Sequence, residues 1–298
     1  MFDFIGKWKL WFSISGLTII FGLVALFFWG LQFSLDFTGG SLMELSFKDG
    51  RPATEQITKT LDQAGISQLQ IQPSGENIYI IRLAGIDETK HQEILTNLRA
   101  EVKSEFTELR FESIGPVIGQ ELRTKSIWSI IVVLLAIIFY IAFAFRRVSK
   151  PIASWKYGLT AVIALIHDLI AAIGIYAFVA HFMHWEVDGL FITALLTILG
   201  FSVHDTIVTF DRTRELLRRS NDDNYEHVVN SAVNQTVVRS LNTSITALLV
   251  LTALFLFGGN STKHFVFTLL IGIFVGTYSS IFIASPIIVL WNKAAKKG

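Results

Sequence analysis

Long runs of apolar positions alternate with short polar segments along this chain of 298 residues. A helix needs about 20 consecutive apolar residues to cross a hydrocarbon layer of about 30 Å. Six runs approach or exceed that length, at residues 11–31, 126–145, 157–180, 189–210, 237–258 and 265–291. The pattern therefore predicts an α-helical integral membrane protein with six transmembrane helices. In the last run, GIFVG at 272–276 matches a small-xxx-small pattern, which favours close helix packing.

A secretory signal peptide is the alternative interpretation of the first run, which follows Lys7 and Lys9. The apolar stretch is too long for a signal peptide. It also ends in the bulky residues Phe28, Trp29 and Leu31 rather than in a cleavage site made of small residues. We therefore interpret the run as a retained membrane anchor.

Residues 32–125, between the first two apolar runs, are polar enough to form a globular domain. Alternating apolar and polar positions predict its strands, and apolar residues at helical spacing predict its helices. The predicted elements are strand 41–47, helix 52–65, strand 68–73, strand 77–85, helix 87–102 and strand 107–114. This βαββαβ order is that of the ferredoxin-like α+β arrangement, which hosts many functions and assigns none by itself.

Residues 115–122 join this domain to the second apolar run. Gly115, Pro116 and Gly119 punctuate the segment, which is typical both of a hinge that leads into a helix and of a simple connector. The sequence leaves the two interpretations open. The predicted organisation is thus an N-terminus with the first transmembrane helix, one extramembrane domain, and five further transmembrane helices, at residues 1–31, 32–125 and 126–298.

Composition narrows the possible classes of protein. Hydrophobic residues make up 52% of the chain and charged residues 16%, which is too apolar for one soluble core. The absence of cysteine excludes disulfides, thiolate metal sites and a cysteine nucleophile. The soluble segments show neither metal-ligand spacing nor a glycine-rich phosphate loop after a strand. We therefore expect no metal, no cofactor and no enzymatic activity.

Positive charge is distributed unevenly between the two sides of the predicted membrane. Only Lys263 lies in the short loops on one side. The other side holds Lys7, Lys9, Arg146, Arg147, Lys150, Lys156, five arginines between 212 and 239, Lys293, Lys296 and Lys297. The positive-inside rule then places both termini in the cytoplasm and residues 32–125 on the far side. Net charge is only +1, so we interpret the basic loops as a topology signal and expect no nucleic-acid partner.

Polar residues interrupt the fourth apolar run, where residues 198–212 read ILGFSVHDTIVTFDR. Ser202, Asp205, Thr209 and Arg212 step by three, four and three, so they share one face of a helix. Asp205 lies about 16 residues, or roughly 24 Å, from the start of the run at Gly189. That depth is inside the hydrocarbon layer.

The fifth run carries a second polar stripe, because Gln235, Arg239, Asn242 and Thr246 step by four, three and four. Asp205 and Arg239 have similar predicted depths, so a carboxylate–guanidinium pair is geometrically reasonable. A charge inside a membrane costs at least about 2.5 kcal/mol on insertion scales and usually marks an ion or proton path. Desolvation and a nearby arginine act on a carboxylate in opposite directions, and a group balanced between them can load and release a proton.

Our hypothesis from these residues is a proton pathway in which Asp205 exchanges a proton and Arg239 stabilises its charged state. Other polar residues would line the seam: Ser202, Asn242, Thr243 and Thr246. The third run adds His167 and Asp168 near mid-bilayer, and the dipeptide His-Asp recurs with His204. A static ion pair that only holds two helices together is the alternative for the first two residues. A neutral packing or hydrogen-bonding role is the alternative for the two histidines.

Five motifs taken together resemble one known family. They are SLDFTGGSLMEL at 34–45, ESIGPVIGQEL at 112–122, ALIHDL at 164–169, GFSVHDTIVTFDRTRE at 200–215 and RSLNTSITALL at 239–249. These segments are similar to the SecD and SecF family of bacterial protein-export subunits, and their order fits its SecF branch. The likeness covers nearly the whole chain.

The resemblance implies one half of a twelve-span assembly with a SecD-like subunit, related to proton-driven RND transporters, in the bacterial inner membrane. In that family the external domains, here residues 32–125 in the periplasm, help to pull an unfolded polypeptide out of a SecY-type channel at the expense of the proton gradient. A YajC-like accessory subunit is also implied. The family's proton-pathway aspartate and arginine fall on Asp205 and Arg239. The DFTGG turn, with Asp36, Gly39 and Gly40, would fix the exit from the first span, because glycine adopts backbone angles that other residues resist.

Two positions depart from the family pattern: Ser34 stands where glycine is usual, and His204 stands where asparagine is commoner. The histidine would alter a pH response, because imidazole titrates near neutrality when unperturbed. Two rival functions stay open from the sequence. One is an RND-type homo-oligomeric exporter of lipids or small molecules, which predicts a deep apolar pocket in the external domain. The other is a purely structural subunit that stabilises the translocon, with Asp205 and Arg239 inert.

Overall fold

The computed structural model describes residues 1–66, 69–102, 104–144, 152–219 and 224–295. The chain divides into two compact units, unit 1 with Met1–Gln32 and Trp128–Gly298, and unit 2 with Phe33–Ile127. Part of the charge pattern behind the predicted orientation lies outside the described residues, namely Arg146, Arg147, Lys150, Lys296 and Lys297.

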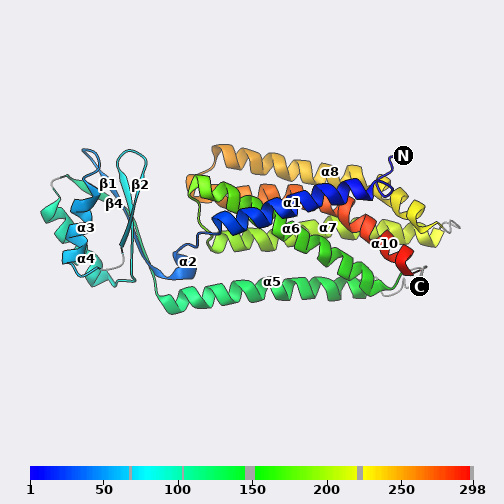
Figure 1. The fold of residues 1–298 in the computed structure, drawn as a ribbon, viewed down its shortest axis with the longest axis horizontal. Helices are drawn as coiled ribbons and strands as arrows, with labels where there is room; N and C mark the ends of the chain where they lie inside the picture. Colours follow the sequence, from blue (N-terminus) through cyan, green and yellow to red (C-terminus); the bar gives the residue numbers. More distant parts are fainter. Residues whose placement is uncertain (67–68, 103, 145–151, 220–223, 296–298) are drawn as a thin grey trace. The chain divides into compact units, whose positions relative to one another are not determined.

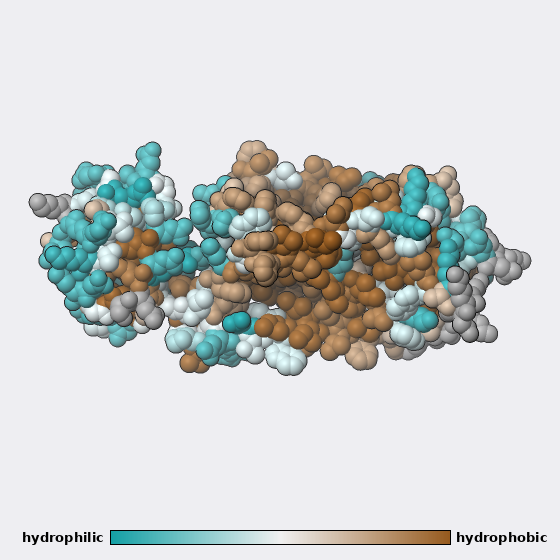
Figure 2. Space-filling view, in the orientation of Figure 1, coloured by the Kyte–Doolittle hydropathy of each residue, from teal (hydrophilic) through white to brown (hydrophobic). Residues whose placement is uncertain are grey.

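Unit 1 is helical. Its elements are α1 (Trp8–Trp29), the greater part of α5 (Pro116–Ala144), α6 (Ser154–Met183), α7 (Gly189–Arg219), α8 (Tyr225–Phe257), the 3₁₀ turn η1 (Asn260–Thr262), α9 (Lys263–Ser279), the turn η2 (Ser280–Ala284) and α10 (Ser285–Ala295). Among the described residues, six helical segments are long and apolar enough to span a membrane, which confirms the predicted number. Figure 2 shows apolar residues gathered over these helices and polar residues gathered over unit 2.

The last span is interrupted, a feature that its apolar pattern did not predict. A π-helical turn, Ser280–Ala284, separates α9 from α10. Pro286 follows it, and a proline has no N–H to donate and clashes with the carbonyl group four residues earlier. A wider turn relieves that clash, and the Ser285 hydroxyl donates to the Ser280 carbonyl at 3.2 Å. Apolar residues fill both regular and wide turns, so hydropathy carries no signal of the change.

Glycines allow two close helix crossings in unit 1. Gly22 of α1 and Gly174 of α6 lie backbone to backbone, so that a side chain on Gly174 would overlap the backbone of Gly22. In the predicted small-xxx-small motif, Gly276 faces Ser202 of α7, and a Cβ there would lie 2.8 Å from the serine Cβ. The motif thus brings α9 against the polar face of α7, as expected of its type.

Unit 2 contains a short helix and a four-stranded sheet covered by two helices (Figure 1). Its elements are α2 (Leu35–Thr38), β1 (Gly40–Phe47), α3 (Thr54–Gln63), β2 (Leu69–Ser74), β3 (Ile78–Leu83), α4 (Glu88–Glu101) and β4 (Phe106–Ile114). From β1 onward the order is the βαββαβ order predicted from the sequence. The strands lie in the order β2-β3-β1-β4, and every neighbouring pair is antiparallel.

The core of unit 2 lies between the sheet and the helices α3 and α4. Every second residue of β1 is buried, and Met43, Leu45 and Phe47 pack against Ile57 of α3 and Ile94 of α4. Asp87 caps α4, because its carboxylate accepts a hydrogen bond from the Lys90 N–H at 2.8 Å. The alternation and the helical spacing that predicted these elements are therefore the contacts that hold them together.

Candidate functional site

The polar face predicted on α7 is buried in unit 1. Ser202, Asp205 and Thr209 expose 1%, 3% and 2% of their surface. The Ser240 hydroxyl of α8 is the hydrogen-bonding group that acts on the Asp205 carboxylate, and His204 and Arg239 act on it through their charge. Its Oδ2 atom is buried and has no hydrogen-bond partner among the described residues. An incompletely satisfied carboxylate inside a membrane helix is costly, which marks this residue as a candidate site.

A second buried carboxylate, Asp168 of α6, ties three helices together. It is fully buried. Its Oδ2 accepts from the Ser202 hydroxyl of α7 at 2.6 Å and from the Ser279 hydroxyl of α9 at 2.8 Å. Its Oδ1 lies 3.0 Å from His167 Nδ1. Both oxygens of Asp168 therefore have the hydrogen-bond partners that a buried charge requires. In Asp205 one oxygen lacks such a partner among the described residues.

Helix α8 presents a different face to α7 than the sequence predicted. Thr236, Ser240 and Ser244, spaced by four, are the buried polar residues of α8. The hydroxyls of Thr236 and Thr209 lie 3.2 Å apart, and Ser244 accepts from the Thr277 hydroxyl of α9 at 2.6 Å. These small hydroxyl residues allow the helices to approach closely while satisfying each other's hydrogen bonds.

The larger polar stripe of α8 faces away from unit 1, which corrects the predicted seam. Arg239, Asn242, Thr243 and Thr246 are all exposed. The threonine hydroxyls donate to carbonyl groups of their own helix, Thr243 to Arg239 at 3.1 Å and Thr246 to Asn242 at 3.0 Å. Within the described part of the chain no ion pair joins Asp205 to Arg239. Helix α8 thus carries two polar stripes with helical spacing. The stripe with the smaller side chains, Thr236 to Ser244, lies at the interface with the other helices because small side chains allow the closest packing.

The remaining predicted intramembrane residues separate into buried and exposed positions. His167 is buried beside Asp168, whereas His204 is exposed on α7. Towards the end of α7, Asp211 pairs with Arg214 at 2.6 Å, and Arg212 donates to the Gln235 side chain at 2.6 Å. Asp211 is thus an exposed, paired carboxylate at this end of α7.

The DFTGG motif forms the short helix α2 followed by two glycines with positive φ. Ser34 caps α2 by accepting a hydrogen bond from the Asp36 N–H at 3.2 Å. Gly39 and Gly40 have φ angles of 68° and 118°, which disfavour any side chain, as predicted. The motif predicts a turn here, but its residues carry no signal of the helical turn before the glycines.

The predicted hinge packs against this motif inside unit 2. Pro116 begins α5, and a Cβ on Gly39 would lie 2.8 Å from Pro116 Cα. A Cβ on Gly119 would lie 2.9 Å from the Gly39 nitrogen, whereas Gly115 has open space around it. The junction is therefore a close backbone contact at Gly39 and Gly119, whereas a side chain would fit at Gly115. This geometry favours a packed joint over a free swivel.

A polar contact that no sequence motif predicts lies at the start of α7. Asp188 accepts from the Phe191 N–H at 2.9 Å and lies 2.9 Å from Nε2 of His264 on α9. Burial raises the pKa of Asp188, but the hydrogen bonds from His264 and Phe191 outweigh it and hold this pKa below the usual value. Residues 76 positions apart in sequence make this contact, so no local spacing signalled it.

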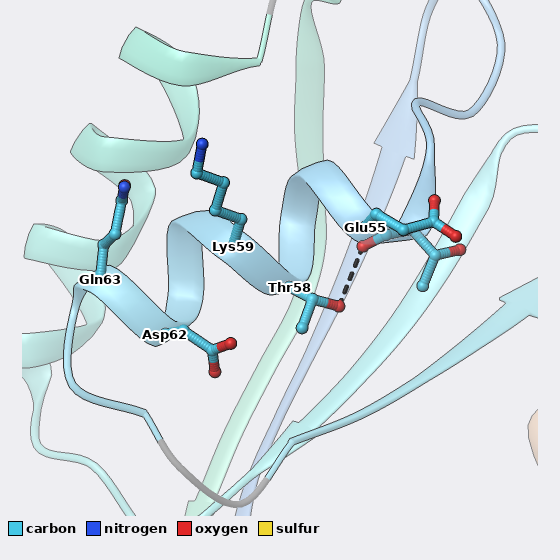
Figure 3. Close-up of a pocket in the computed structure, with 6 residues that line it drawn as sticks. Glu55, Thr58, Lys59, Asp62 and Gln63 are labelled. Atoms are coloured by element: carbon cyan, nitrogen blue, oxygen red, sulfur yellow. Dashed lines mark hydrogen bonds between the residues drawn. The ribbon is translucent and has the colours of Figure 1, made fainter.

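One cavity of unit 2 is a shallow surface feature. Its volume is about 670 Å³, and it is lined by polar residues of α3 alone. Figure 3 shows Glu55, Thr58, Lys59, Asp62 and Gln63 along this helix, with the Thr58 hydroxyl bonded to the Thr54 carbonyl within the same helix. Across the residues that the structure describes, no three His, Cys, Asp or Glu side chains are grouped to hold a metal ion.

Comparisons with known proteins cover nearly the whole chain. The family model "Protein export membrane protein SecD/SecF, C-terminal" matches residues 94–294, and the "SecD/SecF GG Motif" model matches residues 24–50. Protein translocase subunit SecF of Thermobaculum terrenum is 42% identical over 96% of this chain and 93% of its own length. The SecF of Anaerolinea thermophila is 38% identical over 98% of this chain and 94% of its own length.

One solved structure shares the fold over 98% of this chain. It is SecDF, a translocon-associated membrane protein from Thermus thermophilus, with a TM-score of 0.79 and 31% identity. This chain spans only 39% of that SecDF chain. The likeness therefore extends over nearly the full length of the present chain and leaves the larger part of the SecDF chain without a counterpart in it.

Proposed function

The chain belongs to the SecD/SecF family of protein-export membrane proteins, and on that premise we propose that it is a SecF-type accessory subunit of the Sec translocase. With a SecD-like partner it uses the proton motive force to promote late steps of polypeptide export across the cytoplasmic membrane. The role is not enzymatic, and protons are the coupling ion rather than a bound cofactor. Its relatives of nearly equal length carry the name translocase subunit, which supports this role.

The observation that carries the proton coupling is the environment of Asp205. This carboxylate is 3% exposed, and one of its oxygens has no partner among the described residues. The nearby Asp168 accepts three hydrogen bonds and is held in place by them. A carboxylate with an open hydrogen-bonding position changes its protonation at lower cost than one whose partners all stabilise the ionised form. Asp205 is therefore the proton carrier, with the Ser240 hydroxyl as its hydrogen-bonding partner.

The exposed stripe of α8 supports a SecD-like partner. Gln235, Arg239, Asn242 and Thr246 lie on the outer face of a helix that is long and apolar enough to span a membrane. Lipid offers these groups no hydrogen bonds, and polar residues in spans normally face a protein interior or a wet cavity. A second subunit that covers this face would place Arg239 in a protein environment, from which it can stabilise the ionised Asp205.

The same proposal assigns the termini and the extramembrane domain to opposite sides of the membrane. Both termini lie in the cytoplasm, and residues about 32–125 form a periplasmic domain. Its strand order β4-β1-β3-β2, all antiparallel, supports a ferredoxin-like fold.

The packed joint of Gly39 with Pro116 and Gly119 transmits a shift of α5 to this domain. The other partners are a SecY-type channel, a YajC-like accessory subunit, the unfolded polypeptide and membrane lipid.

The test is export of a polypeptide into membrane vesicles that contain this chain, its SecD-like partner and the translocon. Export is measured with and without a proton gradient. Asp205→Asn keeps the shape of the side chain and removes its titration. We expect this variant to assemble normally and to lose the part of export that depends on the gradient. Arg239→Met should lose the same part, because the charged state of Asp205 is then less stable.

The matched control is Asp211→Asn, the same chemical change on the same helix, where the carboxylate is exposed and paired with Arg214. This control should retain gradient-dependent export. Unchanged export with Asp205→Asn would support a purely structural subunit instead. The homo-oligomeric exporter predicts activity without a SecD-like chain, and the polar cavity on α3 gives that rival no support.

A further inference from the structure

The two buried carboxylates of unit 1 lie near the same hydroxyl group on α7. Ser202 donates its hydrogen to Asp168 Oδ2 at 2.6 Å, and Asp205 follows Ser202 by three residues on the same helix. Residues three apart share one face of a helix, with Cβ atoms about 5–6 Å apart. Side chains in a helix also lean towards its N-terminus, so the Asp205 carboxyl leans towards Ser202. Ser202 is therefore a neighbour of both carboxylates.

The surroundings of the Ser202 hydroxyl hold its oxygen in place. Ser202 is 1% exposed and faces Gly276 of α9, where a Cβ would lie 3.1 Å from Ser202 Oγ. The acceptor of its hydrogen is also anchored. Ser279 of α9 donates to the same Oδ2 atom of Asp168 at 2.8 Å, and His167 Nδ1 lies 3.0 Å from Oδ1. Asp168 thus presents a fixed acceptor to Ser202.

A serine hydroxyl has one hydrogen and two lone pairs that can accept. Because Ser202 gives its hydrogen to Asp168, it has none left for Asp205. In agreement with this, Oδ2 of Asp205 is buried and has no hydrogen-bond partner among the described residues. The lone pairs of Ser202 can still accept, and a carboxyl group can donate only when it carries a proton. Ser202 is therefore suited to the protonated form of Asp205.

We propose that Asp168 is a positioning residue for proton exchange at Asp205. By taking the hydrogen of Ser202, Asp168 makes this hydroxyl an acceptor for protonated Asp205 and withholds it as a donor from ionised Asp205. The Ser240 hydroxyl can still donate to the ionised form. Each form of Asp205 then has one hydroxyl partner of its own, so neither is held exclusively. The inference rests on the proposed role of Asp205 and names the residues that tune it.

Charged groups near the two carboxylates act independently of this hydroxyl. Helices α1 and α9 carry charged or histidine side chains only within their first two residues, so their contacts here are neutral. Three groups that can carry positive charge lie near the carboxylates: His167 beside Asp168, and His204 and Arg239, which act on Asp205 through their charge. The test therefore changes hydroxyl groups first and leaves these three residues intact.

The test follows the infrared band of protonated carboxyl groups as pH is varied, in vesicles that contain the full chain and its SecD-like partner. Asp205→Asn identifies the band of Asp205 by its loss. Ser202→Ala removes the acceptor with little change in volume, so the midpoint of this band should move to lower pH. One hydrogen bond corresponds to a change of about threefold to tenfold in proton concentration.

Asp168→Asn should move the midpoint in the same direction. Its neutral amide is a weaker acceptor than an ionised carboxylate, so the Ser202 hydrogen turns to ionised Asp205 and stabilises that form. The matched control is Ser279→Ala, which removes the other hydroxyl from the same Asp168 oxygen and leaves Ser202 in place. Its midpoint should stay at the wild-type value.

The outcomes separate this inference from the proposed function. If the midpoint is unchanged in Ser202→Ala, or shifts equally in Ser279→Ala, Asp168 has no positioning role although Asp205 still exchanges a proton. A shift to higher pH in Ser202→Ala also overturns the inference, because Ser202 would then donate to ionised Asp205 in the wild type. If no band is lost in Asp205→Asn, Asp205 binds no proton, and the proposed function itself fails.

Discussion

Gly174→Ala should destabilise the protein, although alanine is the better helix former. A Cβ on Gly174 would lie closer than 3.0 Å to the Cα, C and O atoms of Gly22, and backbone atoms cannot rotate away as a side chain can. Overpacking costs about 1–3 kcal/mol, and alanine regains up to about 1 kcal/mol of helix propensity. Since the overlap involves backbone only, the upper part of the range applies. The expected net loss is about 1–2 kcal/mol.

Two matched variants give this prediction its internal scale. A Cβ on Gly22 would meet the Ile170 carbonyl oxygen at 3.2 Å and Gly174 Cα at 3.3 Å, so strain and propensity nearly cancel in Gly22→Ala. Gly16 has nothing within 4 Å, so Gly16→Ala should gain up to about 1 kcal/mol. The assay is denaturation in mild detergent, followed by circular dichroism. If Gly174→Ala is as stable as Gly16→Ala, α1 does not cross α6 as described.

Three further outcomes follow from the geometry. The pKa of Asp188 is lower in the folded protein than the unfolded value of about 3.9, so the stabilisation by this carboxylate is complete above pH 3.9 and is lost as pH falls through the folded pKa. Wild type should therefore lose more stability than Asp188→Asn between pH 7 and pH 3. Thermal melting of both proteins at the two pH values measures this difference. In this cysteine-free chain, Asn242→Cys should react with a membrane-permeant thiol reagent and become protected when the SecD-like partner is added, whereas Ser244→Cys should be protected throughout. Asp87→Ala removes the cap of α4 and should cost about 1 kcal/mol in denaturation of the full chain, with equal stability contradicting the cap.

The sequence predicted the elements well where periodicity is set by burial. Strand β1 alternates because one face covers a core, and the six spans are apolar because lipid surrounds them. The helices extend beyond the apolar runs, since α5 begins at Pro116 although the run begins near 126. Hydropathy marks the part of a helix that lies in lipid, and it does not mark where the hydrogen-bonded helix ends.

The candidate site was predicted on one helix and misplaced on the other. On α7 a single polar face exists, so Ser202 and Asp205 were assigned to the interior correctly. On α8 two polar faces lie side by side, and the prediction followed the larger residues of the Arg239 stripe. Close packing instead selects Ser240 and its hydroxyl neighbours. The role of Asp168 as a junction depends on Ser279, which is distant in sequence and gives no local signal.

Proton movement through Asp205 is the central claim, and proton flux tests it most directly. Vesicles with this chain and its SecD-like partner are given a proton gradient, and flux is followed with an internal pH dye. The account predicts that wild type and Asp211→Asn conduct protons and that Asp205→Asn does not. Flux that persists undiminished in Asp205→Asn, in vesicles with equal amounts of assembled complex, would contradict the assignment of Asp205 as the proton carrier.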